Sequence, residues 1–331
     1  MQEFLLINQE EISSILDMET VIAAVEKAYA LKVSGQAELF PIVCHEFKDE
    51  DSEFDIKSGS MDGAGVFGMK LVSAFYENDA YGLPRLMGTI LVFDRKTGQL
   101  KSMMDGTLIT NMRTGAAGGV GAKYLARPDS ETVLLLGTGA QGMPLLRATL
   151  QVMKHIKRII VANVHTPGKA SEFAKNAAAE FGMEVEAVEK LADLERAVRS
   201  SDIILTATPS KEAIIQADWV KPGTHLSCIG SDMEGKQELD VDLTAKAKAF
   251  ADDLNQVISV GECEKAVKQG LLKPENITEI GQVILGNALG RENDEEITIF
   301  DSTGIGLQDL MTAAMIADKA KEKNIGTSLK I

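Results

Sequence analysis

Cysteine, long apolar runs and positive charge are all scarce in this chain. Its three cysteines, Cys44, Cys228 and Cys263, are widely spaced, with no CxxC pair and no histidine at metal-ligand spacing. This pattern excludes a disulfide framework and indicates no metal site, so we expect reduced, buried thiols in a cytoplasmic protein. No apolar run reaches the roughly eighteen residues of a membrane span, and the N-terminus lacks the basic segment of a secretory signal.

The charge balance is acidic. The 331 residues hold 34 Lys and Arg against 49 Asp and Glu, for a net charge of −15. Nucleic acids and anionic membranes attract basic surfaces, so neither is an expected partner. With 45% hydrophobic and 25% charged residues, the composition is that of an ordinary globular protein, and the length favours about two domains.

A glycine-rich loop in the middle of the chain is its most informative motif. The apolar run Val133 to Leu136 leads into GTGAQG and then into an apolar helical pattern, which predicts a strand, a tight turn and a helix. In such a loop the first glycine lets the chain turn and the second lets a diphosphate approach the backbone. The third lets the helix and the strand pack closely. We therefore expect cofactor contacts at Gly137, Thr138, Gly139, Ala140 and Gln141.

The loop alone is weak evidence, because glycine-rich turns without a ligand are common. Its surroundings strengthen it. A strand candidate at 158–164, a helical pattern at 169–181 and a strand candidate at 184–188 supply the alternation that a dinucleotide-binding half requires. A further strand candidate at 202–207 ends at Thr208, another expected cofactor contact.

The end of the second strand bears on the choice of cofactor. An acidic residue there normally accepts the ribose hydroxyls, whereas this chain has Asn163 and His165 and no Asp or Glu nearby. Its absence leaves room for a 2′-phosphate. We therefore favour NADP(H) over NAD(H), with Asn163 and His165 on the ribose side.

Two domains can be placed along the chain, which predicts an α/β protein. The alternating pattern predicts a Rossmann-type doubly wound parallel sheet over residues 120–305. Strand patterns before it predict an α+β domain for substrate binding and dimerisation. The last helical pattern, 308–323, has no strand left to serve in the parallel sheet, so we expect it to return to the first domain. That domain then comprises 1–119 and 306–331.

Two other segments of the chain have helical patterns. Residues 108–125 predict a helix despite four glycines, each costing about 1 kcal/mol relative to alanine, which close packing or the approach of a ligand usually compensates. Residues 258–271 also predict a helix.

Five separated motifs resemble the ornithine cyclodeaminase and mu-crystallin family. The resemblance covers nearly the whole chain in one order. It implies a Rossmann domain joined to a substrate and dimerisation domain made from both chain ends, in a homodimer. The family includes ornithine and lysine cyclodeaminases, alanine dehydrogenases and imine reductases. The motifs are FGMKLV at 67–72, the run from Gly82 through ITNMRTGAAGGVGAKYLA, GTGAQ at 137–141, GSDMEGKQEL at 230–239 and FDSTGIGLQD at 300–309.

The resemblance also implies particular site residues. Lys70 would contact the substrate carboxylate and assist proton transfer, and Asp232 would act as an acid or base beside the nicotinamide. Without the resemblance, Lys70 would be read as a solvated strand residue and Arg113 as a surface arginine. A planar guanidinium also suits a clamp on a carboxylate or on cofactor phosphate. The remaining expected cofactor contacts are Ser231, Thr303 and Gly304.

One departure from the family pattern bears on the substrate. Thirteen residues before the active-site lysine, the cyclodeaminases look to carry a glutamate that holds the distal amine, and this chain has Lys57. A cation there would repel the second amino group of ornithine. It would suit a neutral side chain or a second carboxylate.

The leading hypothesis is therefore an NAD(P)H-dependent oxidoreductase of amino-acid metabolism that reduces an imino acid by hydride transfer. Two alternatives stay open. One is a cyclodeaminase, a lyase that uses bound NAD catalytically and releases ammonia. The other is a non-catalytic NAD(P)-dependent binder of a small ligand. Net consumption of the cofactor separates the first reading from both alternatives.

Overall fold

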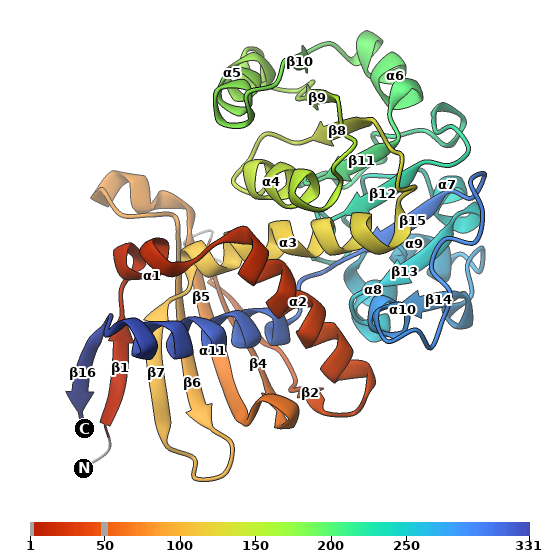
Figure 1. The fold of residues 1–331 in the computed structure, drawn as a ribbon. Coiled ribbons are helices and arrows are strands. Elements are labelled where there is room, and N and C mark those ends of the chain that lie inside the picture. The colour runs from red at the N-terminus through yellow and green to blue at the C-terminus, as the bar shows by residue number, and fades with distance from the viewer. Residues whose placement is uncertain (1–2, 48–51) are drawn as a thin grey trace. The chain divides into compact units, whose positions relative to one another are not determined.

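The computed structural model describes residues 3–47 and 52–331. Contacts divide the chain into two compact units (Figure 1). Unit 1 comprises Met1–Arg113 and Ile305–Ile331, and unit 2 comprises Thr114–Gly304. The sequence patterns placed these boundaries at 119/120 and 305/306. Among the described residues, no helix combines the length and the apolar character that crossing a membrane would need.

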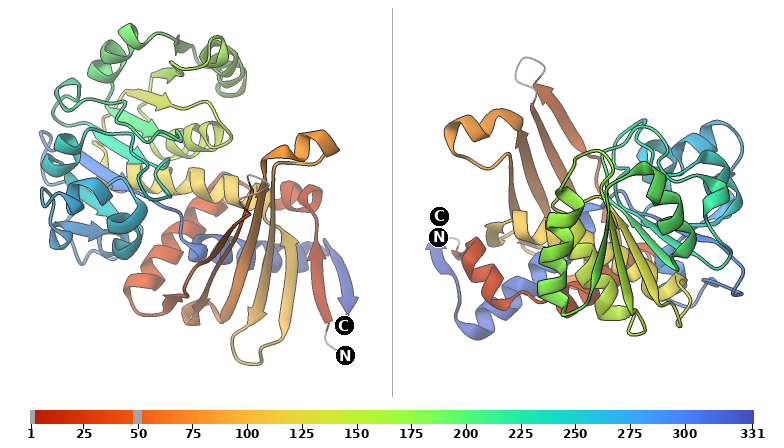
Figure 2. Two further views of the ribbon diagram at one scale, coloured as in Figure 1. Left: turned by 180° about the vertical axis from the view of Figure 1, so that it is seen from behind. Right: turned by 90° about the horizontal axis from the view of Figure 1, so that it is seen from above.

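Unit 1 is built on an eight-stranded mixed sheet in the order β16-β1-β7-β6-β5-β4-β2, with β3 paired to β4. The N-terminal and C-terminal strands pair with each other, so both ends of the chain lie side by side (Figure 2). The strands are β1 (Glu3–Ile7), β2 (Ala37–Leu39), β3 (Val43–Phe47), β4 (Ser52–Met61), β5 (Val66–Phe75), β6 (Leu86–Asp94), β7 (Leu100–Asp105) and β16 (Thr327–Lys330). The helices are α1 (Gln9–Ile15), α2 (Met18–Val33), the start of α3 (Thr107–Leu125) and α11 (Gly306–Lys323), with short 3-10 helices at Asp62–Ala64 and Tyr76–Tyr81.

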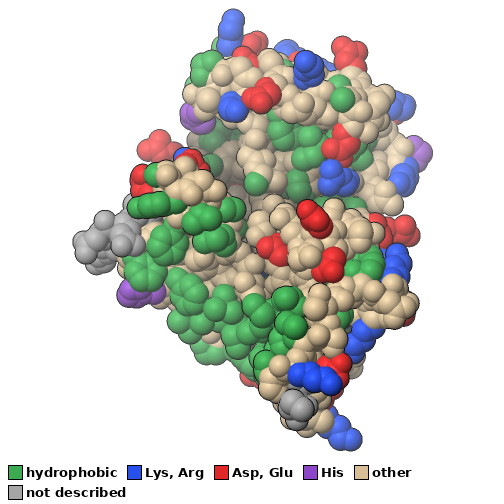
Figure 3. All heavy atoms as spheres, turned by 90° about the vertical axis from the view of Figure 1, so that its left-hand side faces the viewer, with side chains coloured by type: hydrophobic (Ala, Val, Ile, Leu, Met, Phe, Trp, Pro, Cys, Tyr) green, Lys and Arg blue, Asp and Glu red, His purple; other side chains and the backbone are tan. Residues whose placement is uncertain are grey.

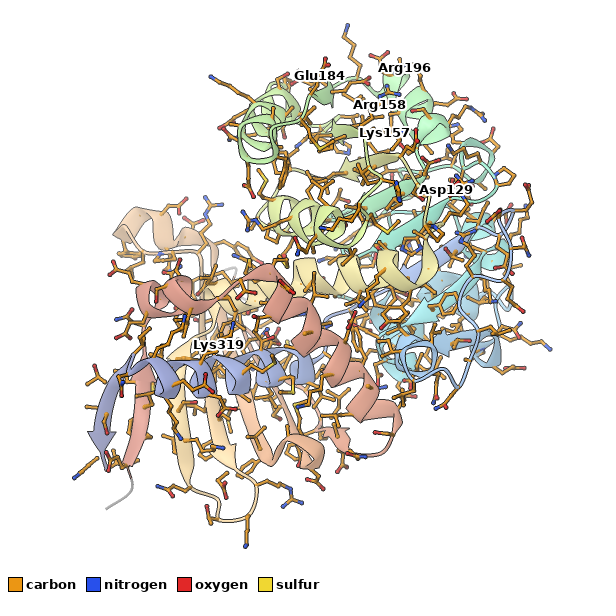
Figure 4. All side chains as sticks on the ribbon, viewed as in Figure 1. Asp129, Lys157, Arg158, Glu184, Arg196 and Lys319 are labelled. Carbon is orange, nitrogen blue, oxygen red and sulfur yellow. The ribbon has the colours of Figure 1, made fainter. Side chains whose placement is uncertain are left out.

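The last helix does return to the first unit, as the sequence pattern predicted. Helix α11 packs on β4, β5 and α2. Near its C-terminal end Lys319, labelled in Figure 4, donates to Asp17 Oδ2 at 3.0 Å and to Thr20 Oγ1 at 2.6 Å on the N-terminal side of α2. The prediction of a domain built from both chain ends is therefore confirmed.

The sheet of unit 1 has an apolar outer face. Along β5 the side chains alternate, and Lys70 points towards α11 while Met69 and Leu71 point the other way. Phe67 of β5 stacks on Phe93 of β6 on this outer face, with ring centroids 5.0 Å apart. Figure 3 shows hydrophobic side chains gathered over a broad area of unit 1. On this outer face, the large apolar side chains left exposed on β6 and β7 are Met87 and Met103.

Unit 2 is an all-parallel sheet of eight strands in the order β10-β9-β8-β11-β12-β15-β13-β14. Alternate residues of β8 enter two different cores, Leu134 with Leu136 in one and Val133 with Leu135 in the other, so both faces of the sheet are covered. The predicted Rossmann-type parallel sheet is confirmed. The strands are β8 (Thr132–Leu136), β9 (Arg158–Ala162), β10 (Val185–Val188), β11 (Ile203–Thr206), β12 (His225–Cys228), β13 (Lys248–Ala251), β14 (Ile277–Glu279) and β15 (Thr298–Asp301).

One helix of unit 2 differs from the helix that the sequence pattern predicts. The helix predicted over 258–271 is broken in two, because Cys263 N donates to Asp301 Oδ2 at 2.9 Å and Gly261 packs against the same carboxylate. In α3, a Cβ on Gly115 would lie 2.4 Å from Pro144, so this glycine lets α4 approach closely. Besides the rest of α3, the helices are α4 (Gly142–Val152), α5 (Lys169–Phe181), α6 (Leu191–Ser200), α7 (Val241–Lys246), α8 (Leu254–Val260), α9 (Glu264–Lys268) and α10 (Ile280–Ile284), with short 3-10 helices at Ala217–Trp219 and Pro274–Asn276.

Candidate active site

A buried group of charged side chains lies between the sheet and α11 in unit 1. Lys70, on β5, is 2% exposed, and its Nζ donates to Asp309 Oδ1 at 2.9 Å and to Thr110 Oγ1 at 3.3 Å. Arg113, on α3, donates from Nε to the same Asp309 oxygen at 3.0 Å. Lys70 and Arg113 are therefore held together by one carboxylate, although they lie on different elements.

The sequence reading missed two members of this group, which we call the Lys70 cluster (Lys70, Arg113, Gln308 and Asp309). Gln308 Oε1 accepts from Arg113 at 2.8 Å, and its amide donates to the hydroxyl of Tyr29 on α2. Both Gln308 and Asp309 are fully buried in the first turn of α11. The signal was present, since they end the motif FDSTGIGLQD as two polar residues in an otherwise apolar stretch of helix.

Burial sets the charge states in the Lys70 cluster. Burial, reinforced by the nearby Arg113 cation, lowers the pKa of Lys70 to about 7, against the opposing attraction of Asp309. Burial also opposes ionisation of Asp309, but Arg113 and Lys70 together hold the pKa of its carboxyl below the usual value. Asp309 is therefore an anion, and Lys70 changes its charge near neutral pH.

Lys57 lies beside the cluster. It pairs directly with Lys70 across β4 and β5, and directly opposed residues of an antiparallel pair project from the same face of the sheet. Its charge acts on both Lys70 and Asp309, lowering the pKa of each. The structure thus brings Lys57, Lys70 and Arg113 together within unit 1.

The glycine loop of unit 2 has the shape that a dinucleotide requires. Gly137 has a φ of 110° and a Cβ there would lie 2.5 Å from the Ala207 carbonyl oxygen, so only glycine fits. A Cβ on Gly139 would meet no atom of the described residues within 4 Å, which leaves the backbone open to a diphosphate. On Gly142 it would lie 3.0 Å from Phe173, where α4 and α5 meet. Gly137 to Gln141 thus fit a bound nicotinamide dinucleotide.

The expected ribose-side residues follow β9 directly. Asn163 donates to Thr138 Oγ1 at 2.7 Å, and its Oδ1 accepts from Thr166 N at 3.0 Å, so it ties the end of β9 to the glycine loop. His165 and Thr166 are exposed beside it. Between Asn163 and Gly168 the chain carries no acidic residue.

The other expected cofactor residues lie at the same edge of the sheet, because the carboxyl ends of parallel strands meet there. Thr208 follows β11, Ser231 follows β12, and Thr303 and Gly304 follow β15. Asp232, next to Ser231, is exposed and forms an ion pair of 2.6 Å with Lys236.

The described residues hold no group of three or more His, Cys, Asp or Glu side chains that could bind a metal ion. All three cysteines are free thiols. Cys228 and Cys263 are buried as expected, but the expectation is wrong for Cys44, which is exposed because it lies on the edge strand β3.

Comparison with known proteins extends over the whole chain. The sequence profile of the ornithine cyclodeaminase/mu-crystallin family matches residues 2–324. An alanine dehydrogenase from Archaeoglobus fulgidus is 38% identical over 331 residues, which cover 99% of this chain and 98% of that protein. The crystal structure of the iminosuccinate reductase of Paracoccus denitrificans in complex with NAD+ matches with a TM-score of 0.94 at 33% identity, over 100% of both chains. An archaeal alanine dehydrogenase dimer with bound NAD matches with a TM-score of 0.91 at 37% identity, over 99% of both chains.

Proposed function

Because the chain belongs to the ornithine cyclodeaminase/mu-crystallin family, we propose that it is an NAD(P)H-dependent reductase that transfers hydride to the α-carbon of an imino acid. The Lys70 cluster is the observation that carries the proposal. Two buried cations, Lys70 and Arg113, share the single carboxylate of Asp309, which leaves positive charge in excess of that carboxylate. Such a group suits an anionic substrate. The alanine dehydrogenase and iminosuccinate reductase among its relatives are named for reactions of this kind.

Each side chain has a distinct part in the proposed reaction. Arg113 and the Lys70 ammonium bind the substrate carboxylate and fix its orientation. A pKa of about 7 lets Lys70 hold a proton at Nζ near neutral pH and give it to the imine nitrogen. Asp232 steadies the substrate nitrogen or activates water. When bound, the reduced nicotinamide supplies the hydride.

Lys57 favours an imino acid with a second carboxylate. It shares a face of the sheet with Lys70, so a substrate held at Lys70 would present its side chain to a further cation. A second carboxylate is attracted there, and a distal ammonium group is repelled. The imine of oxaloacetate has a second carboxylate, whereas ornithine has a distal ammonium group.

For the cofactor we propose a preference for NADPH. The stretch after β9 has no acidic residue to accept ribose hydroxyls and exposes His165 and Thr166, which leaves space for a 2′-phosphate. The structures of the relatives were solved with NAD, so a direct comparison of the two cofactors is the test.

We also propose that the chain forms a homodimer through the outer face of the unit 1 sheet. The face carries apolar side chains on neighbouring strands, including Met87 and Met103. Large exposed apolar areas of this kind mark interfaces between proteins. The archaeal alanine dehydrogenase is described as a dimer.

The test is oxidation of NADPH and NADH, followed by absorbance, with pyruvate, oxaloacetate and glyoxylate in the presence of ammonia or methylamine, and with cyclic imines. We expect net consumption, fastest with oxaloacetate and ammonia. In Lys57→Glu that preference should fall by about tenfold or more relative to pyruvate. Lys96→Glu, the same charge reversal in an exposed turn of unit 1, is the matched control.

Two results would contradict the proposal. Release of ammonia from ornithine with no net change in cofactor would identify a cyclodeaminase. Binding of the cofactor without turnover of any substrate would identify a small-ligand binder. An unchanged substrate profile in Lys57→Glu would contradict the proposed preference for a second carboxylate. It would not contradict the proposed reductase activity.

A further inference from the structure

Unit 2 buries several carboxylates at the edge of the sheet where its expected cofactor residues lie. Glu238, Glu262, Asp252 and Asp301 are each at most 2% exposed. Within residues 3–47 and 52–331, no ion pair involves Glu238 or Glu262, whose partners are all backbone N–H groups or hydroxyls. Burying a carboxylate without a cation costs free energy, which indicates that the hydrogen bonds of these groups have a role besides packing.

Glu238 joins two loops. Its Oε1 accepts from Thr208 N, in the loop after β11, at 2.7 Å. Its Oε2 accepts from Gly230 N, in the loop after β12, at 3.1 Å, and from Thr206 Oγ1 at 2.7 Å. One carboxylate thus sets the spacing of the two loops that carry Thr208 and Ser231.

Glu262 accepts hydrogen bonds from both Glu238 and Ser231. Its Oε2 accepts from Ser231 Oγ at 2.7 Å, and its Oε1 accepts from Leu239 N at 2.7 Å. The backbone N–H of Glu238 points at both oxygens, at 3.1 and 3.0 Å. Glu262 reaches this place because the chain leaves its helix after α8, at the break that the sequence pattern did not predict.

The same arrangement recurs after β15. Asp252 Oδ2 accepts from Gly304 N and from Ser302 Oγ, both at 2.9 Å, and Asp252 Oδ1 lies 3.4 Å from Thr303 Oγ1. The expected cofactor residues that follow β11, β12 and β15 therefore all form hydrogen bonds to buried carboxylates. The residues are Thr208, Ser231, Thr303 and Gly304.

We propose that Glu238, braced by Glu262, is a positioning residue that fixes the loops after β11 and β12 in the geometry that binds the nicotinamide cofactor. The inference rests on the proposed function. Three donors converge on Glu238, and an ionised carboxylate accepts from all of them. A glutamine in its place would turn an amide donor towards one of the loop N–H groups, which would be left unpaired.

The charge state of the pair gives a readout that a purely structural role would not move. Burial, together with the neighbouring Glu262, raises the pKa of Glu238 to about 7, and burial raises the pKa of Glu262 to about 7 as well. The other titratable groups around the pair are Asp301 and the thiols of Cys228 and Cys263, which are also buried. A proton taken up by the pair removes an acceptor from the loops, so cofactor affinity should fall as the pH drops through about 7.

The experiment is a titration of the full-length protein with NADPH and NADH, followed by nicotinamide fluorescence, between about pH 6 and about pH 8. In the wild type we expect affinity to weaken towards the acidic end. In Glu238→Gln the dissociation constant should rise by about tenfold or more, and its pH dependence should become weaker because only Glu262 of the pair still titrates. Asp202→Asn is the matched control, because Asp202 accepts from Glu131 N and Thr132 N at the opposite end of β11. It should leave the affinity unchanged.

A milder variant guards against misfolding of Glu238→Gln. The Thr206 hydroxyl lowers the pKa of Glu238, so Thr206→Val should move the acidic weakening of the wild type to higher pH. The positioning role would be overturned if the wild-type affinity were independent of pH and Glu238→Gln bound the cofactor as tightly as Asp202→Asn does. The proposed function would not be affected by that result. Failure of the wild type to bind either cofactor would overturn the proposed function and this inference with it.

Discussion

Asp309→Asn should destabilise unit 1 more than almost any other change of equal size. The asparagine keeps the shape of the side chain but removes the negative charge that Lys70 and Arg113 share at 2.9 and 3.0 Å. Asp309 is fully buried, so water cannot replace it. Removing one partner from a buried ion pair costs about 3–5 kcal/mol, since the remaining charge is left uncompensated. We expect a loss of unfolding free energy in that range.

The loss should depend on pH in a defined direction. The pKa of Lys70 in the folded wild type is about 7, and Asp309 is what holds it up. Without Asp309 the folded pKa falls further below the ordinary lysine value. A depressed folded pKa means that stability is lost as the pH falls from the pKa of the unfolded lysine to that of the folded one. Below about pH 7 the Lys70 of the wild type is protonated, and it no longer changes the free energy of unfolding with pH. In the variant this free energy keeps falling by about 1.4 kcal/mol per pH unit until Lys70 is protonated there too. The variant should therefore be penalised more near pH 6 than near pH 8.

The assay is urea unfolding at about pH 6 and about pH 8, followed by circular dichroism and by tryptophan fluorescence. The single tryptophan, Trp219, belongs to unit 2, so fluorescence reports that unit while circular dichroism reports both. Lys70→Met combined with Asp309→Asn should be less destabilised than the sum of the two single variants, because the double variant leaves no lysine cation stranded. A loss below about 1 kcal/mol that is equal at both pH values would refute the charge argument.

Two further changes test the cofactor loop and the outer face of unit 1. Gly139→Ala adds a Cβ where no described atom lies within 4 Å, so the melting temperature should hardly move, while the KM for the cofactor should rise by about tenfold or more if a diphosphate approaches there. Equal KM values would place the diphosphate elsewhere. Met103→Glu puts a charge on the apolar outer face. If the chain dimerises through this face as proposed, sedimentation should show a dimer for the wild type and monomers for the variant. A dimer that survives this change would use another surface.

The sequence predicted much of the architecture because local patterns carry it. Strand, glycine loop and helix follow one another within a few residues around Gly137, and the alternating units after it read directly as a parallel sheet. The return of the last helix followed from counting strands. These features depend on spacing along the chain, which a single sequence displays.

The contacts that assemble the site could not be predicted in the same way. Lys70 and Asp309 are 239 positions apart, and no local pattern tells a lysine on a strand which carboxylate will face it. The break at Gly261 was missed for the same reason, since Asp301, which accepts the Cys263 N–H, comes from a distant strand. Such pairings become visible only when the elements are in place.

Unit 1 is completed by a segment that follows unit 2 along the chain. Helix α11 carries Asp309 and β16 pairs with β1, whereas unit 2 is one continuous stretch, Thr114–Gly304. During synthesis unit 2 therefore completes its sequence while Lys70 and Arg113 still lack the carboxylate that they share. The nucleotide-binding fold can finish first and the Lys70 cluster last. A chain interrupted before α11 would keep the glycine loop but would lack the carboxylate that Lys70 and Arg113 share.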